Sequence, residues 1–246
     1  MAKENRTAAI LVIGDEILYG ETQDTNSTFL CRQLTARGVD VRRIVTLPDE
    51  SEEIITALTR LREYGYDYIL TCGGIGPTPD DITRVAVARA LGVDLVLDQT
   101  AVQRYEELRG GPLNEKQLEM CRLPDGSHPL FAESTGAPGF KVENIYVLPG
   151  VPEILQAFWE RIESQFDGEP LHVETFVTSS RESEFASKMA EYQASYPELK
   201  FGSYPRIVGA GWEVRIRVRG RPRELVQEAA AKFMADVGGM PQPPTL

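Results

Sequence analysis

The sequence is poor in the residues that bind transition metals or form disulfides. Among its 246 residues are three cysteines, Cys31, Cys72 and Cys121, and two histidines, His128 and His172. The cysteines are widely spaced and none belongs to a CxxC pair, so the sequence predicts neither a disulfide framework nor a zinc site. Neither histidine has a second ligand type at metal spacing, which argues against a catalytic or metal-binding histidine.

The sequence also lacks long hydrophobic runs and an excess of positive charge. The longest apolar run, Ala8–Ile13, is far too short to cross a bilayer, and no signal-peptide pattern precedes it. With 37 Asp and Glu against 26 Lys and Arg, the formal net charge is −11. That charge opposes generic binding to nucleic acid or to an anionic membrane. We therefore expect a cytoplasmic protein without a membrane partner, and nucleic acid is disfavoured as a partner.

The composition is that of a folded globular protein, with 42% hydrophobic and 26% charged residues. Up to about Phe166, hydrophobic periodicity predicts strands that alternate with helices, which is typical of a mostly parallel sheet with helices on both faces. We therefore expect an α/β fold, a three-layer sandwich. The expected strands are Ala8–Ile13, Val39–Leu47 and Asp67–Cys72, followed by a hairpin of Gly139–Val142 and Ile145–Leu148. The expected helices are Asn26–Arg37, one whose first turn is Asp49–Glu53, Asp81–Leu91, Gln99–Leu108, Asn114–Met120 and Pro152–Phe166.

A domain boundary is expected where turn residues gather, at Phe166–Pro170. The sequence therefore predicts one domain over residues 1–168, a small α+β domain over residues 169–238 and a flexible tail over residues 239–246. The small domain is expected to have the order βαββα. Its expected elements are Leu171–Thr178, Glu182–Tyr192, Leu199–Tyr204, Trp212–Val218 and Arg223–Ala235.

The strongest motif is GGIGPTPDDIT, Gly73–Thr83, between an expected strand and an expected helix. Glycines allow successive backbone N–H groups to converge on an anion, and the helix start adds partial positive charge, so the loop suits a phosphate or diphosphate. It is not a Walker loop, because GK[ST] is missing, and Pro79 replaces the third glycine of the Rossmann fingerprint. A tight turn without a ligand is the alternative.

Two carboxylates, Asp80 and Asp81, follow these glycines and would repel a bound phosphate unless a cation stood between them. Their oxygens suit Mg²⁺ or a similar ion, which would polarise phosphorus for attack by water. Helix N-capping is the alternative role for either residue. Asp15 and Glu16 follow the first strand and lie at the same predicted edge of the sheet, so either can complete the metal's ligands or orient the water.

Other glycine-bearing or polar segments are expected near that edge. Asp24 and Asn26 follow the first strand, and Asn26 alternatively caps the next helix. STGAPGF at Ser134–Phe140 and LPGVPEI at Leu148–Ile154 are the third and fourth such segments, and the latter enters a helix through proline. Each segment is a weak signal alone.

Together these segments resemble the molybdopterin-binding (MoaB/Mog-like) domain. More closely they resemble the N-terminal domain of the competence/damage-inducible CinA proteins and the related domain fused to eukaryotic FAD synthase. The resemblance covers roughly residues 7–166, and GSYP at Gly202–Pro205 extends it more weakly. The matching segments are GDEIL at Gly14–Leu18, DTN at Asp24–Asn26, GGIGPTPDD at Gly73–Asp81, TGAPGF at Thr135–Phe140 and LPGVPE at Leu148–Glu153.

The resemblance implies one of two activities. CinA-type domains are associated with metal-dependent hydrolysis of the diphosphate in ADP-ribose, giving AMP and ribose 5-phosphate, whereas MoaB/Mog proteins bind molybdopterin and adenylylate it. The closer match favours a hydrolase of ADP-ribose or a related dinucleotide. The alternative is a protein that binds molybdopterin or a flavin nucleotide without hydrolysis. The deamidase domain usual in CinA proteins is absent from this sequence, so deamidase activity is not expected. A homodimer is what the resemblance suggests.

The expected catalytic and metal-binding residues are Asp80, Asp81 and Glu16. Mg²⁺, Co²⁺ or Ni²⁺ is the expected cofactor, and a monovalent cation is a further candidate. The residues expected to bind phosphate, nucleotide or pterin are Gly14, Asp15, Asn26, Gly73, Gly74, Gly76, Pro77, Thr78, Thr135, Gly136, Pro138, Gly139, Pro149, Gly150, Pro152 and Glu153.

Two further signals receive plainer interpretations. Arg215, Arg217, Arg219, Arg221 and Arg223 alternate around Val214, Ile216 and Val218, so three of the arginines line one face of an expected strand whose other face is apolar. A nucleic-acid patch is weighed there against a solvent-facing or edge strand protected by charge, or a local counterweight to the acidic larger domain. Cys72 precedes the glycine loop, but it has no neighbouring histidine in the sequence, and we expect it to be an inert, buried residue.

Overall fold

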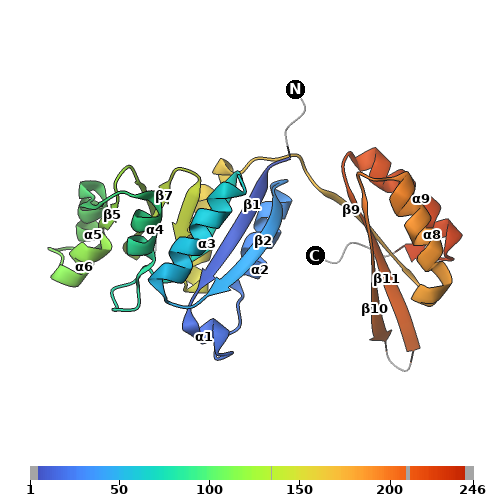
Figure 1. Ribbon diagram of the computed structural model, residues 1–246, viewed down its shortest axis with the longest axis horizontal. Helices are drawn as coiled ribbons and strands as arrows, with labels where there is room; N and C mark the ends of the chain where they lie inside the picture. The colour runs from blue at the N-terminus through green and yellow to red at the C-terminus, as the bar shows by residue number, and fades with distance from the viewer. Residues whose placement is uncertain (1–4, 134, 209–210, 242–246) are drawn as a thin grey trace. The chain divides into compact units, whose positions relative to one another are not determined.

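The computed structural model describes residues 5–133, 135–208 and 211–241. The chain divides into two compact units, residues 1–168 and 169–246, which are described separately (Figure 1). Within the described ranges, no helix has the length and apolar character that a membrane span requires.

The N-terminal unit contains a six-stranded sheet whose order is β2-β1-β3-β8-β7-β6. The first four strands in this order, β2, β1, β3 and β8, are parallel to one another. Strand β7 is antiparallel to β8, and β6 is antiparallel to β7. The α/β fold with a mostly parallel sheet is therefore confirmed. The strands are β1 Thr7–Ile13, β2 Asp40–Leu47, β3 Tyr68–Cys72, β6 His128–Ala132, β7 Thr135–Val142 and β8 Ile145–Leu148.

Helices pack on both faces of this sheet. This explains why the sequence of β1 is continuously apolar. Ala8, Ile10 and Val12 belong to a core with helices α2 and α7, while alternate residues of the same strand belong to a second core with α3 and α4. A strand buried on both faces cannot alternate between apolar and polar residues. The helices are α1 Asp15–Leu18, α2 Asn26–Ala36, α3 Ser51–Glu63, α4 Thr83–Leu91, α5 Gln99–Arg109, α6 Glu115–Met120 and α7 Pro152–Ile162.

Several elements of this unit differ from the sequence-based expectation. The segment TGAPGF forms part of β7, which begins at Thr135 and not at the expected Gly139, and its glycines are needed for packing. A Cβ on Gly136 would lie 2.2 Å from the ring of Tyr105, and one on Gly139 would lie 2.6 Å from the carbonyl oxygen of Val147. Helix α7 ends at Ile162, and a 3₁₀ turn follows. Four short elements were not expected: α1, β6, and the paired strands β4 Leu95–Leu97 and β5 Arg122–Pro124.

The C-terminal unit has the predicted order βαββα. Its antiparallel sheet has the order β10-β11-β9-β12, and helices α8 and α9 contribute to one apolar core with it. The first residues of the expected flexible tail are instead paired, because Met240 and Pro241 form β12 against β9. Residues 242–246 of that tail lie outside the described residues. The elements are β9 His172–Thr178, α8 Glu182–Ser195, β10 Lys200–Val208, β11 Gly211–Gly220, α9 Arg223–Asp236 and β12 Met240–Pro241.

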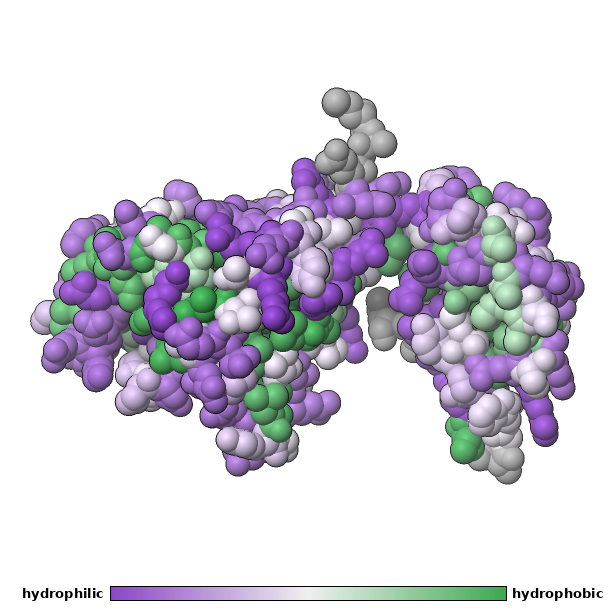
Figure 2. All heavy atoms as spheres, in the orientation of Figure 1, coloured by the Kyte–Doolittle hydropathy of each residue, from purple (hydrophilic) through white to green (hydrophobic). Residues whose placement is uncertain are grey.

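Hydrophilic residues cover much of the face shown in Figure 2, and apolar residues reach the surface in several places on both units. On α1 and just after it, Leu18 and Tyr19 are exposed. In the C-terminal unit, Ile207 and Val208 are exposed at the end of β10.

Candidate functional site

A cavity of about 590 Å³ lies at the carboxyl ends of parallel strands of the N-terminal unit. It is bordered by the loops that follow β1, β3 and β8, as the parallel topology predicts. The predicted residues that line it are Gly14, Glu16, Gly73, Gly74, Gly76, Pro77, Asp80, Asp81, Thr135, Pro149 and Gly150. The predicted residues that are not among its lining are Asp15, Asn26, Thr78, Gly136, Pro138, Gly139, Pro152 and Glu153.

Glycine is required in the loop after β3 because backbone segments meet there. Gly73 and Gly74 have φ values of +108° and +66°. A Cβ on Gly73 would lie 2.0 Å from the carbonyl oxygen of Ile13, and one on Gly150 would lie 3.3 Å from the Cα of Gly73. The loops after β1, β3 and β8 therefore pack backbone against backbone, which larger residues would prevent.

The carbonyl groups of this loop are held by the start of α4. The Thr83 hydroxyl donates to the carbonyl oxygen of Gly73 at 2.9 Å, and the Thr83 amide donates to that of Gly74 at 3.0 Å. The Arg84 guanidinium donates to the carbonyl oxygen of Ile75 and, at 3.1 Å, to that of Gly76. Four successive carbonyl oxygens are thus fixed by two adjacent residues.

Arg84 is a site residue that sequence reasoning missed. Its side chain is buried, and burial lowers the pKa of its guanidinium, while the nearby Asp81 acts in the opposite direction. One signal could have identified it. A cation in the first turn of a helix faces the positive end of the helix dipole, so its presence there requires another interaction.

Asp81 has a different role from the one expected, because its carboxylate binds the loop itself. It accepts hydrogen bonds from the Gly76 amide at 2.6 Å and from the Thr78 amide at 2.8 Å. The Thr78 hydroxyl also donates to it. Part of the amide cradle expected to hold a phosphate is therefore occupied by this internal carboxylate. The amides of Gly74 and Ile75 have no hydrogen-bond acceptor among the described residues.

Three other carboxylates line the cavity: Glu16, Asp49 and Asp80. Asp49 was interpreted from the sequence as part of the first turn of a helix, but it precedes α3 and lies two residues after the end of β2. Its carboxylate accepts a hydrogen bond from the Asp15 amide at 3.0 Å. Burial raises the pKa of Asp49, and the nearby charges of Asp15, Glu16 and Asp80 also raise it. This end of the cavity is therefore strongly acidic.

The expected metal ligands do not form a preorganised metal site in this structure. The described residues contain no group of three or more His, Cys, Asp or Glu placed to hold a metal ion. Asp81 is hydrogen-bonded to the loop, which leaves Glu16 and Asp80 from the predicted set. The divalent metal stays a prediction.

Two of the alternatives considered from the sequence are resolved. Asn26 is not the cap of α2, because it is the first residue of the helix and its Nδ2 donates to the carbonyl oxygen of Gly150 at 2.6 Å. It therefore ties the helix to the loop after β8.

Cys72 is buried, and burial raises the pKa of its thiol to about 12. A thiolate nucleophile at that position is excluded near neutral pH.

Four side chains form an apolar wall of the cavity. They are Tyr105, Met120, Ile154 and Phe158. Sequence reasoning missed these residues because they come from helices α5, α6 and α7 and not from the loops that the motifs mark. A cavity lined by both polar backbone and apolar side chains suits a ligand that has a charged group and a ring.

Comparison with known proteins agrees with this geometry. Residues 9–166 match the family described as "Probable molybdopterin binding domain", and residues 170–240 match "FAD synthase, middle domain". A protein of Archaeoglobus fulgidus is 32% identical over 91% of this chain and 95% of its own length. A "Probable FAD synthase" of Caenorhabditis elegans is 29% identical over 96% of this chain, which spans 51% of that protein.

The solved structure of a CinA protein from Thermoplasma acidophilum is similar to the N-terminal part of this chain. The two are 32% identical, and the match covers 66% of this chain and 98% of the CinA chain with a TM-score of 0.62. The predicted resemblance is thereby confirmed. On its sequence match and its fold, the chain belongs to the molybdopterin-binding domain family.

Proposed function

We propose that the N-terminal unit binds a phosphorylated ring compound, a pterin or a flavin nucleotide, in the cavity described above. The observation that carries this proposal is the loop after β3. Its four carbonyl oxygens are bonded by Thr83 and Arg84, while the amides of Gly74 and Ile75 have no acceptor in the part of the chain that the structure describes. Oriented amides at a helix start are suited to a phosphate. The apolar wall with Tyr105 and Phe158 then receives the ring.

The charges of the site limit which phosphorylated ligands it accepts. Hydrogen bonds from backbone amides to a charged phosphate contribute about 1.5–3 kcal/mol each. The carboxylates of Glu16, Asp49 and Asp80 act against them by repulsion. The site should therefore favour a ligand that combines few phosphate charges with a large ring, whose burial contributes about 25 cal/mol per Å².

Calorimetric titration with FMN, FAD, a phosphorylated pterin and ADP-ribose tests the proposal, using two glycine variants as a matched pair. Gly74→Ala places a Cβ 2.3 Å from the Thr83 hydroxyl, whereas Gly65→Ala has a similar φ, +69°, with open space around it. Both substitutions carry the backbone cost of about 1–2 kcal/mol. Only Gly74→Ala should weaken binding, by about tenfold or more. Equal affinity in both variants, or no saturable binding to any of the four compounds, contradicts the proposal.

Hydrolysis of ADP-ribose is a second candidate function. The observation that favours it is the set of three carboxylates on the cavity wall, among which Asp49 has a raised pKa. A carboxyl group with a raised pKa is suited to proton transfer from the attacking water. Binding is the stronger proposal because Asp81 is engaged by the loop and no three-ligand metal group lies among the described residues.

The two functions are separated by measuring release of AMP from ADP-ribose with Mg²⁺, Co²⁺ and Ni²⁺. A catalytic metal site should lose about 2 to 4 powers of ten in rate in the Asp80→Asn variant. Saturable binding without AMP release would leave binding as the function. Turnover that is equal in Asp80→Asn and the parent would remove Asp80 from any catalytic role.

A further inference from the structure

The sheet of the C-terminal unit has one face that its helices do not cover. Val214, Ile216 and Val218 of β11 are buried with α8 and α9 in the core of this unit. The alternate residues of β11 therefore belong to the other face, called the open face here. Cross-strand pairing adds residues of β10 and β9 to that face. The residues at these positions are Lys200, Gly202, Tyr204, Arg206, Glu213, Arg215, Arg217, Arg219, Val173, Thr175 and Val177. Val177 is itself buried.

Three arginines of the open face lack a charge partner. Glu213 is paired with Arg206, and the described residues place no carboxylate within 4.0 Å of the guanidinium groups of Arg215, Arg217 or Arg219. The Nε atoms of Arg215 and Arg217 are buried without a hydrogen-bond partner in the described chain. The inner parts of these two side chains are therefore buried, while no carboxylate among the described residues balances their charge. A buried polar atom without a hydrogen-bond partner is unusual for an arginine whose role is structural.

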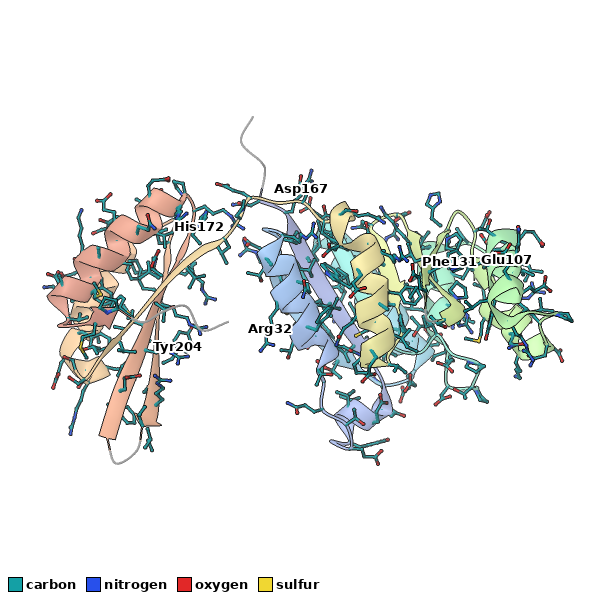
Figure 3. All side chains as sticks on the ribbon, turned by 180° about the vertical axis from the view of Figure 1, so that it is seen from behind. Arg32, Glu107, Phe131, Asp167, His172 and Tyr204 are labelled. Atoms are coloured by element: carbon teal, nitrogen blue, oxygen red, sulfur yellow. The ribbon has the colours of Figure 1, made fainter. Side chains whose placement is uncertain are left out.

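An aromatic ring lies beside this charge. Tyr204 is 44% exposed, and the guanidinium of Arg217 lies 5.7 Å from the centre of its ring. The ring covers Gly202, where a Cβ would lie 2.9 Å from the Tyr204 hydroxyl. The ring of Tyr204, which Figure 3 labels on this unit, therefore packs on Gly202 and remains accessible to solvent.

The two sequence-based arguments against a polyanionic partner do not hold for this unit. β11 lies between β10 and β9, so its arginines do not protect a sheet edge. Residues 169–246 contain ten acidic and ten basic residues, so the net charge of −11 belongs entirely to residues 1–168. The basic face therefore belongs to a unit that has no net charge of its own.

We propose that the open face binds single-stranded nucleic acid, with phosphates against Arg215, Arg217 and Arg219 and a base stacked on Tyr204. Alternate residues of a strand are about 6.7 Å apart, so the arginines form a row along which an extended backbone can run. A positive surface combined with an exposed ring is the arrangement by which proteins bind single strands. Lys200 lies opposite Arg219 on β10 and adds positive charge beside the end of this row.

Fluorescence anisotropy of the full chain with labelled 12-nucleotide oligo-U and oligo-dT tests this proposal. The parent should bind saturably at low salt, and Arg217→Gln should reduce the slope of log affinity against log salt by about 0.7, the value for one lost single-strand phosphate contact. Arg223→Gln is the matched control, because Arg223 is an exposed residue at the start of α9 in the helical layer. It should leave the slope unchanged.

The ring is tested separately. Tyr204→Ser should weaken binding by about tenfold, and Tyr204→Phe should retain parental affinity, because stacking needs the ring and not the hydroxyl. Circular dichroism of each variant distinguishes lost binding from lost folding. The proposal is overturned by absence of binding at about 100 µM protein, the weak end of non-specific binding. It is also overturned by equal salt slopes for Arg217→Gln and Arg223→Gln, or by capture on phosphatidylserine vesicles without oligonucleotide binding.

Discussion

The two units offer different chemistry to an anion. In the N-terminal unit, which carries the whole net charge of −11, the candidate site consists of neutral backbone amides near four carboxylates. In the C-terminal unit, which is neutral overall, the candidate surface consists of arginine side chains on an open sheet. Fixed amides in a cavity suit a small ligand of defined shape, whereas a row of arginines suits an extended polyanion. The comparison teaches that mean charge alone does not locate anion binding.

The sharpest way to test this difference is to remove one arginine from each unit. Arg84→Met should reduce the free energy of unfolding by about 2–4 kcal/mol, because it leaves two buried carbonyl oxygens without donors. Arg217→Met should change it by less than about 1 kcal/mol, because the guanidinium loses only its contact with the exposed ring of Tyr204 among the described residues. Urea denaturation of both variants measures the difference. Similar losses in the two variants would show that the arginines have the same structural role.

Asp81 provides the next largest effect, because its carboxylate bonds two amides of the loop. Asp81→Asn should cost about 1–3 kcal/mol in the free energy of unfolding, since an amide group accepts less well than a carboxylate. Asp125→Asn is the control, because Asp125 accepts one hydrogen bond, from the Gly126 amide, in an exposed turn. Thermal unfolding of both proteins would show whether Asp81 stabilises the loop. An unchanged midpoint for Asp81→Asn would contradict its role as the internal anion.

The salt dependence of ligand affinity should also differ between the two units, and this effect is smaller than the preceding ones. Three phosphate contacts on the open face predict that oligonucleotide affinity falls roughly tenfold to twentyfold between 50 and 200 mM salt. Binding of a flavin nucleotide at the neutral amides should change far less over that interval. Parallel titrations with FMN and oligo-U on one protein sample check this. Equal salt dependence for the two ligands would remove the distinction between the units.

The smallest expected effect concerns Asp49, whose raised pKa marks the acidic end of the cavity. Because the pKa is higher in the folded state than in the unfolded chain, folding favours the protonated carboxyl group. Stability should therefore fall as the pH rises from about 3.8, the unfolded value, through the folded pKa. Asp49→Asn should flatten this part of the profile and slightly raise the melting temperature at neutral pH. A variant that melts lower than the parent at neutral pH, with unchanged pH dependence, would contradict the interpretation.

Local patterns predicted the elements that form the sheet edge, and they failed where distant residues meet. β1 could be recognised because a continuous apolar run fits a strand buried on both faces, and its carboxyl end then placed Gly14 near Gly73. Tyr105 and Phe158 could not be found, because nothing local marks a side chain that reaches the cavity from a distant helix. The strand β7 was expected to begin only at Gly139, because glycines that allow close packing, such as Gly136, look the same in sequence as glycines that bend the chain.

The central claim is that the loop after β3 offers its amides to a phosphoryl group. The most direct test is to follow the backbone amide resonances of the protein by NMR during titration with FMN. We predict that the largest saturable shifts occur at Gly74 and Ile75, while the amide of Gly65 remains unchanged. Saturable binding with the largest shifts elsewhere in the chain, and none at Gly74 and Ile75, would contradict the account.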